Sequence, residues 1–447
     1  MESCLMTGTK PIQHPLSPAD AFFVAYQQGS GILMQLGFEL ELEGAIRRTD
    51  LEGMLLHLVG RWPQLGQKVR HQGLGLVWDG ACHVEEMLNV ASDEALLKEW
   101  RNLPLDPFCE PPFQLLWFAN SQTHRLVVRA HHAVMDGEAM LTVYLEMMRF
   151  LSRSVGGQSL LPPVAVLPAK PMSAVELLAP LCSSEAWDHL RRMSRQAKAN
   201  VSARLAVRSY APGPTATCER LLEGEGLKML SELAAINRTQ PLWLCAAAWM
   251  RSLNGWNRAS NKGSNPIISL EFPVSLRRHK ASRELLGNLV SPLILSGDAT
   301  QCVGTLANAL KRQFIGAIRQ RQHLALPQLM CPLRFLPWTL FRRLVMTPLA
   351  TGAATSHFTW HENENDRSSN VSEWSHGRLQ ITNRRIYTPV CLHMGTALVV
   401  VSTNNSLLFS ITYRLSALSA EDADKLADLL QAELMRSPMA LTHQDAN

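Results

Sequence analysis

The sequence lacks the cysteine spacing of a disulfide-stapled or zinc-binding protein. Its 447 residues include nine cysteines, an odd number, and no two of them are separated by only two positions. A disulfide framework or a CxxC metal site is therefore not expected. Scattered unpaired cysteines are typical of proteins in a reducing compartment.

The sequence also lacks a hydrophobic run long enough to cross a membrane. The longest nearly uncharged stretch, Tyr387–Tyr413, is interrupted by Pro389, Gly395 and the pair Asn404-Asn405. This pattern predicts two strands joined by a turn. The first residues contain no apolar segment of the kind found in secretory signals. We expect a soluble, cytoplasmic protein with no membrane span.

A strong charge of either sign is missing as well. The chain has 43 Lys and Arg against 38 Asp and Glu, a net charge of +5. This small excess does not indicate a nucleic-acid-binding protein, but it is compatible with an acidic partner or a phosphorylated substrate. The composition, 46% hydrophobic and 18% charged, is that of a globular chain able to bury a large core.

Helical and strand-like patterns alternate through both halves of the chain, which predicts an α/β or α+β fold. Between the halves, Gly156-Gly157 is followed by four prolines within fifteen residues, the best linker candidate in the chain. We expect an N-terminal lobe over residues 1–171 and a C-terminal lobe over residues 172–447.

Hydrophobic spacing and turn residues predict the individual elements. The expected helices cover residues 49–60, 94–102, 138–151, 184–207, 227–236, 241–253 and 421–435. The expected strands cover residues 36–42, 113–118, 125–130, 266–272, 293–295, 397–402 and 407–413. Asp50 and Thr239 are expected to cap two of the helices.

The most informative segment is His131-His132-Ala133-Val134-Met135-Asp136-Gly137, between an apolar strand and a helix. Neighbouring side chains on a strand point to opposite faces, so one histidine can face a cavity while the other is buried. Gly137 permits a tight turn, and Asp136 can hold the loop by pairing with an arginine. A metal site is not expected, because no third ligand stands at a suitable spacing.

This segment resembles the HHxxxDG signature of the condensation-domain and chloramphenicol-acetyltransferase-like acyltransferase superfamily. Other segments are similar to the superfamily in the same order, so the resemblance covers nearly the whole chain. These segments are Pro15–Asp20, Arg61–Leu65, Leu105–Pro107, Pro273–Arg277, Leu286–Asn288 and Ser369–Val371. Two departures stand out: the DFGWG motif of plant relatives is absent, and Ser372 replaces the glycine usual after Ser-Asn-Val.

The resemblance implies two pseudo-symmetric lobes in a V, with an active-site tunnel between them. It implies that His132 carries the chemistry as a general base. His131, Asp136 and Gly137 are implied to be structural, with Arg277 as the partner of Asp136 and the adjacent Arg278 as the alternative. Ser369, Asn370 and Asn288 are the candidates for oxyanion stabilisation or substrate positioning.

A histidine also suits the reaction on chemical grounds, because its pKa lies near neutrality. The absence of GxSxG agrees with direct transfer and no covalent enzyme intermediate. We expect an acyl group to move from a coenzyme A or carrier-protein thioester to a hydroxyl, in specialised-metabolite or lipid biosynthesis. The thioester is a co-substrate, and no bound cofactor is expected. We expect a discrete, monomeric enzyme acting on a small-molecule or lipid alcohol or amine.

Two alternatives remain open at this stage. One is an amide-forming, freestanding condensation enzyme with the same base, acting on a carrier-bound donor and an amine. The other is a non-catalytic domain that recruits a carrier protein. In such a domain the motif is expected to be lost, whereas here both histidines, Asp136 and Gly137 are intact.

Two basic segments carry further hypotheses. A cluster at Arg191, Arg192, Arg195 and Lys198 can dock coenzyme A phosphates or an acidic carrier protein, or can simply be a solvated helix face. Residues 332–343 combine apolar and basic side chains. They can line a lipid-binding mouth, rest on a membrane surface, or form a core-facing helix with a basic outer side. Their two prolines argue against one continuous helix.

Overall fold

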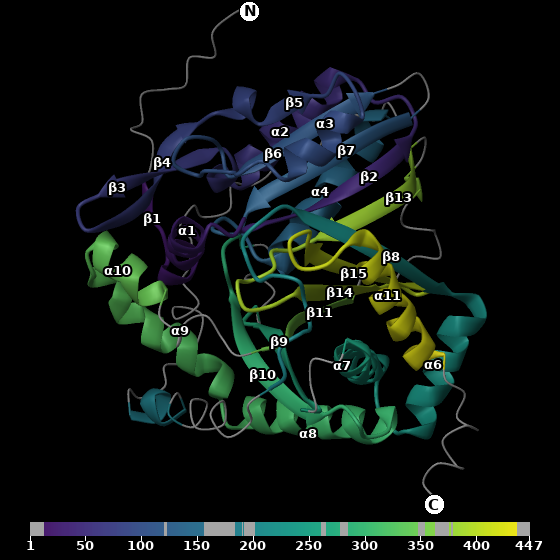
Figure 1. The fold of residues 1–447 in the computed structure, drawn as a ribbon. Helices are drawn as coiled ribbons and strands as arrows, with labels where there is room; N and C mark the ends of the chain where they lie inside the picture. Colours follow the sequence, from purple (N-terminus) through teal and green to yellow (C-terminus); the bar gives the residue numbers. More distant parts are fainter. Residues whose placement is uncertain are drawn as a thin grey trace, which may run out of the picture.

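The computed structural model describes residues 13–119, 123–155, 184–189, 191, 202–260, 265–277, 285–346, 354–362, 375–376 and 379–435. Two six-stranded sheets and the helices packed on them form the molecule, which confirms the predicted α/β class (Figure 1). The predicted linker at 156–171 lies outside the described residues. Within the described residues, no helix is both long enough and apolar enough to cross a bilayer.

The first sheet contains the strand that ends in the histidine pair. Its strand order is β12-β13-β2-β7-β6-β5. The bounds are Ser375–His376 for β12, Leu379–Tyr387 for β13, Gln35–Glu43 for β2, Thr123–His131 for β7, Phe113–Ala119 for β6 and Leu88–Val90 for β5. The predicted pairing of β6 with β7 is antiparallel, as a short connection requires. Strands β12 and β13 come from the C-terminal half, and β13 pairs with β2.

The second sheet has the order β10-β9-β11-β14-β15-β8. The bounds are Val290–Asp298 for β10, Ile267–Ser275 for β9, Ser356–Glu362 for β11, Thr396–Ser402 for β14, Ser406–Arg414 for β15 and Thr215–Glu223 for β8. The predicted hairpin across Asn404-Asn405 is present as β14 and β15. Strand β11 is parallel to both of its neighbours and occupies the middle of the sheet.

A third, small sheet of β1 (His14–Pro15), β4 (Gly75–Cys82) and β3 (Gln67–Gln72) lies beside the first. The described helices are α1 (Pro18–Ser30), α2 (Arg48–Arg61), α3 (Ala95–Arg101), α4 (Gly137–Val155), α6 (Gly224–Ile236), α7 (Pro241–Ala259), α8 (Val303–Arg319), α9 (Ala325–Met330), α10 (Trp338–Val345) and α11 (Ala420–Leu434). Each large sheet has its own apolar core, because the helices bury one stripe against it.

The cap predicted at Asp50 is placed differently in the structure. Helix α2 begins at Arg48, and Asp50 lies in its first turn, where its carboxylate accepts a hydrogen bond from the backbone N–H of Arg47. Thr239 does not cap α7, since Gln240 precedes that helix and no side chain caps it.

The long helix predicted over residues 184–207 is wrong in its last part. Residues 184–189 and 191 are helical, but residues 202–207 have no regular secondary structure. The backbone N–H of Ala203 donates to the carbonyl of Ile267, and that of Ala206 donates to Asn257 Oδ1. These bonds to β9 and α7 replace the helical ones, and they bury Leu205 in the core of the second sheet.

Helix α1 has no counterpart among the predicted elements, although its sequence carries a clear start signal. Ser17 is the N-cap, its hydroxyl accepts a hydrogen bond from the N–H of Asp20, and Pro18 stands at the first helical position. Polar residues at its ends and a weak apolar stripe obscured it. The helix contributes Phe22, Phe23 and Tyr26 to the cavity between the sheets.

Candidate active site

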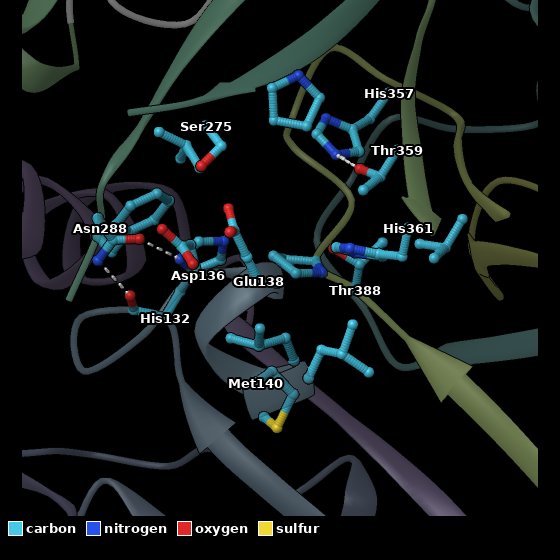
Figure 2. Close-up of a pocket in the computed structure, with 18 of the residues that line it drawn as sticks. His132, Asp136, Glu138, Met140, Ser275, Asn288, His357, Thr359, His361 and Thr388 are labelled. Carbon is cyan, nitrogen blue, oxygen red and sulfur yellow. Dashed lines mark hydrogen bonds between the residues drawn. The ribbon is translucent and has the colours of Figure 1, made fainter. Parts of the chain in front are cut away.

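A cavity of about 980 Å³ lies between the two large sheets. Its volume is at the upper end of the range for small-molecule sites. One wall comes from α1, β2, the loop after β7 and α4, and the other from β9, β10, β11 and β14. Figure 2 shows His132 and Asn288 on one side, with His357, Thr359 and His361 on the other.

His131, the last residue of β7, faces away from this cavity. Its side chain is fully buried, and Nδ1 accepts a hydrogen bond from the backbone N–H of Ala133 at 3.0 Å. Burial, with a smaller effect from His132, lowers the pKa of His131 to about 3. The ring is therefore neutral at pH 7, with its proton on Nε2, and it holds the turn that follows the strand.

His132 points the other way and lines the cavity. Its Nδ1 lies 2.8 Å from Asn288 Oδ1, while Asn288 Nδ2 donates to Asp20 Oδ1 at 2.8 Å and to the His132 carbonyl at 2.7 Å. Both of these partners of Nδ2 are acceptors, which fixes the amide with its oxygen toward the imidazole. Asn288 Oδ1 must then accept from Nδ1–H, so the lone pair of His132 is on Nε2.

The surroundings of His132 keep its ring neutral and in one plane. The ring of Phe23 stacks on it with centroids 3.8 Å apart and an interplanar angle of 12°. Burial is the largest effect on the pKa of His132 and lowers it below the ordinary value. A neutral, oriented imidazole whose Nε2 has no hydrogen-bond partner within the described residues can accept a proton at pH 7.

Asp136 and Arg277 form a buried ion pair between the two lobes, which we call the latch. Arg277 Nη1 donates to Asp136 Oδ2 at 2.7 Å, and the two side chains are 0% and 2% exposed. The N–H of Leu289 donates to the same carboxylate oxygen, and that of Ala139 donates to Oδ1. The carboxylate thus caps the start of α4 and binds Arg277 and Leu289, and Asp136 also lines the cavity.

Gly287 adds a further contact between the two lobes and sets the position of Asn288. Its φ of +102° is one that residues with a side chain rarely adopt. The N–H of Gly287 donates to the carbonyl of Val134, and the next residue, Asn288, donates its own N–H to Asp20 Oδ1. Burial raises the pKa of Asp20, whereas its hydrogen bonds to Asn288 and Ser17 oppose that effect.

The opposite wall was not foreseen from the sequence. His357, Thr359 and His361 alternate along β11 and therefore face the same side of the sheet. His357 Nε2 lies 2.6 Å from Thr359 Oγ1, and His357 Nδ1 lies 3.4 Å from Glu271 Oε1 on β9. The alternation His-x-Thr-x-His is visible in the sequence, but nothing in it indicates a strand facing a cavity.

His361 lies over the start of α4. A Cβ atom added to Gly137 would stand 3.1 Å from His361 Nε2 and 3.2 Å from Cε1. Burial lowers the pKa of His361 to about 4. Its imidazole makes no hydrogen bond within the described part of the chain. Glycine at position 137 of the motif therefore provides the space that this second histidine occupies.

From His132 the cavity extends along α4. Met140, Leu141, Tyr144 and Leu145 line it, followed by Arg149 near the far end of the helix. At 1.5 Å per residue, Gly137 and Arg149 are about 18 Å apart. A mostly apolar passage of this length ends among the charged side chains of Arg61, Glu146 and Arg149, with Arg384 also lining the cavity.

Most of the remaining predicted site residues are not described by the structure. Ser369 and Asn370 lie outside the described residues, as do Arg192, Arg195 and Lys198. Arg191 is exposed and lies 3.6 Å from Asp188. Among the described residues, His83, Glu85 and Glu86 are the only group close enough to share a metal ion, and none of them lines the cavity.

No protein-family model matches the sequence, and no curated protein matches it. Solved structures match over almost the entire chain. The trichothecene 15-O-acetyltransferase TRI3 from Fusarium sporotrichioides has a TM-score of 0.71 at 12% identity and covers 96% of both chains. The condensation domain of the monacolin K polyketide synthase MokA has a TM-score of 0.68 at 14% identity, over 95% of this chain and 96% of its own.

A third similar structure is polyketide synthase associated protein 5 from Mycobacterium tuberculosis, with a TM-score of 0.64 at 15% identity, over 96% of this chain and 99% of its own. At these identities the likeness defines the fold and not the reaction. The chain therefore has the two-lobe fold of condensation domains and chloramphenicol-acetyltransferase-like acyltransferases. The fold that the HHxxxDG resemblance implied is confirmed.

Proposed function

We propose that this protein is an acyltransferase that moves an acyl group from a thioester to a hydroxyl, with His132 as general base. The observation that carries the proposal is the hydrogen bond from His132 Nδ1 to Asn288 Oδ1. It leaves Nε2 as the basic atom, on a ring that lines the cavity. The fold shared with an O-acetyltransferase adds support for ester formation.

In the proposed reaction the acceptor hydroxyl hydrogen-bonds to Nε2 of His132. Its oxygen attacks the thioester carbonyl as Nε2 takes the proton, forming a C–O bond and a tetrahedral oxyanion. The C–S bond then breaks, and the imidazolium returns the proton to the leaving thiolate. Asn288 stabilises the transient positive charge on the ring through its carbonyl oxygen. Ser369 and Asn370 remain the proposed donors to the oxyanion.

The donor is proposed to be acyl-coenzyme A or an acyl group on a carrier protein. The passage along α4 is long enough for an extended pantetheine arm or acyl chain, and its charged end offers Arg61 and Arg149 near the opening. A passage of this kind would hold donor and acceptor together in a reactive orientation, which supplies much of the rate enhancement. Docking of the donor at Arg191, Arg192, Arg195 and Lys198 remains a separate hypothesis.

Amide formation with the same base is the second candidate, because the fold is also that of a condensation domain. The two reactions differ only in the atom that attacks, and a neutral imidazole accepts a proton from either. Parallel assays with alcohols and amines of equal chain length distinguish them. The intact contacts of His132 and Asp136 favour both of these over a non-catalytic recruitment domain.

The test is thiol release and product formation from acetyl-, octanoyl- and palmitoyl-coenzyme A, each with matched alcohols and amines. We expect His132→Ala to lower transfer by roughly 10²–10⁴-fold, the usual worth of a general base. The control is His83→Ala, a histidine outside the cavity, which is expected to retain wild-type activity. Thermal unfolding of each variant checks that the fold is intact. Equal transfer by wild type and His132→Ala would overturn the mechanism.

A further inference from the structure

The charges of this protein are unevenly distributed along the chain. Residues 299–361 contain seven Lys or Arg and no Asp or Glu. The rest of the sequence therefore has more acidic than basic residues, since the whole chain has 43 of one and 38 of the other. This basic region includes α8, α9, the 3₁₀ turn η5 (Cys331–Phe335) and α10. An excess of cations along the sequence favours an anionic partner where their side chains share a surface, and three of the seven belong to η5 and α10.

The same region exposes large apolar side chains, and one of them lines the cavity. Phe335, Leu340 and Leu344 are 67%, 50% and 41% exposed. Leu344 also lines the cavity, together with Leu333 of η5. A residue that is both exposed and part of the lining stands at the rim, so η5 and α10 frame one mouth of the cavity. Figure 1 shows α9 and α10, in green, at the edge of the molecule beside α1.

Helix α10 is anchored to the protein through its buried side chains. Phe341 and Val345 are buried and pack in one cluster with Tyr26 of α1 and Met34. Leu340 and Leu344 are four residues apart and share a flank of the helix, and Arg343 lies next to them. Pro337 separates η5 from α10, as the two prolines of this segment predicted. An apolar flank bordered by arginines is thus left uncovered at the mouth.

The guanidinium groups of the same segment lie next to these apolar side chains in the sequence. Arg334 lies over the ring of Phe335, 4.7 Å from its centroid. Arg342 and Arg343 are exposed and make no ion pair within the described part of the chain. Long cationic side chains beside aromatic and aliphatic ones match the boundary between lipid headgroups and acyl chains.

We propose that η5 and α10 form a docking surface for an anionic lipid bilayer. Phe335, Leu340 and Leu344 enter the headgroup region, while Arg334, Arg342 and Arg343 contact lipid phosphates or carboxylates. The apolar mouth then opens onto the bilayer, so that an apolar substrate enters the cavity without crossing water. An acidic protein partner satisfies the arginines but leaves this apolar flank and its continuity with the cavity unexplained.

The experiment is co-sedimentation of the full-length protein with two kinds of vesicle. One is phosphatidylcholine alone, and the other also contains about 30% phosphatidylglycerol, an anionic lipid. We expect binding to the anionic vesicles, weakening as salt is raised from about 0.1 to 0.5 M. Arg342→Gln with Arg343→Gln is expected to weaken binding about 30-fold, from roughly fivefold for each cation. Leu340→Ser with Leu344→Ser is expected to weaken it about 10-fold, by removing partly buried apolar groups.

Matched controls remove similar side chains elsewhere. Leu56 and Leu221 are 61% and 53% exposed on α2 and β8, and Leu56→Ser with Leu221→Ser is expected to bind vesicles like wild type. Arg48→Gln with Arg258→Gln is the control for charge. Equal weakening by control and test variants, or no binding to anionic vesicles, would overturn the proposal. Retention by an immobilised acidic acyl-carrier protein without vesicle binding would assign the surface to a protein and also overturn it. Because no turnover is measured, the outcome is independent of His132.

Discussion

The two walls of the cavity both carry histidines, yet they are built differently. On the first wall, both the backbone and the ring of His132 are fixed by Asn288, which is itself held by Asp20. On the second wall, His361 rests over Gly137 and makes no hydrogen bond within the described residues. The difference bears on the proposal that His132 is the base, because facing the cavity alone does not distinguish one histidine from another. A base also needs one ring nitrogen oriented and the other left open.

The largest expected effect concerns the latch that holds the first wall. Replacing Arg277 by Met leaves the Asp136 carboxylate buried without its counter-charge, which costs about 3–5 kcal/mol. The free energy of unfolding in urea measures this loss. Because the latch joins the His132 loop to the second lobe, we also expect activity to fall in parallel.

The exposed pair of Arg48 with Glu52, 2.7 Å apart on α2, is the matched control. Arg48→Met is expected to change stability by about 0–1 kcal/mol, as for most surface ion pairs. If the two substitutions destabilised the protein equally, the Asp136–Arg277 pair would not be the connection that secures this wall.

The second effect concerns the orientation of His132, the proposed base. Asn288→Ala removes the acceptor for His132 Nδ1–H, a bond to a group that becomes charged during the reaction. Bonds of that kind are worth about 1.5–3 kcal/mol, so transfer should fall roughly 10–150-fold. The acid limb of the rate profile should also move to lower pH, because the imidazolium loses a stabilising acceptor. A purely structural role would lower activity without moving that limb.

Thr359→Val is the matched change on the opposite wall, where it removes the hydroxyl 2.6 Å from His357 Nε2. A typical hydrogen bond is worth about 0.5–1.5 kcal/mol, so we expect about a 10-fold change at most and no shift of the acid limb. A larger loss for Thr359→Val than for Asn288→Ala would make β11 the reactive wall.

The sequence predicted the first wall far better than the second. The HHxxxDG spacing places a strand, a turn and a helix in consecutive residues, so local rules are sufficient to orient His131 and His132 oppositely. The contact of Asp136 with Arg277 was accessible through the family resemblance, although 141 positions separate them. Asn288 was predicted to stabilise the oxyanion or position the substrate; it lines the cavity, and its contact with the ring of His132 was not predicted.

The second wall depends on long-range pairing that no local pattern reveals. Strand β11 lies between β9 and β14 as a parallel strand, and such pairings require distant segments to meet. The stacking of Phe23 on His132 and the bond from Asn288 to Asp20 likewise join α1 to residues more than 100 positions away. Of these features, only the helix start signal at Ser17 could have been recognised from the sequence, and it was missed.

A third effect follows from the depressed pKa of His361, about 4 in the folded state. The unfolded chain has the ordinary value near 6.5, so between pH 6.5 and 4 the unfolded state binds the extra proton. Stability is therefore full above pH 6.5 and decreases as the pH falls toward 4. The free energy of unfolding in urea should be measured at pH 7 and pH 5. Between these pH values it should fall by roughly 1–2 kcal/mol more for wild type than for His361→Gln. An identical pH dependence in both proteins would place His361 in contact with water.

The smallest expected effect tests how the two walls meet. Gly137→Ala adds a methyl group 3.1 Å from His361 Nε2, closer than side chains normally approach, and overpacking of this kind costs about 1 kcal/mol. In a His361→Ala background the methyl group has room, so the same substitution should cost little. A double-mutant cycle on unfolding free energies measures this coupling. Strict additivity would mean that the glycine serves the turn itself and not the histidine opposite, which would separate the two walls into independent units.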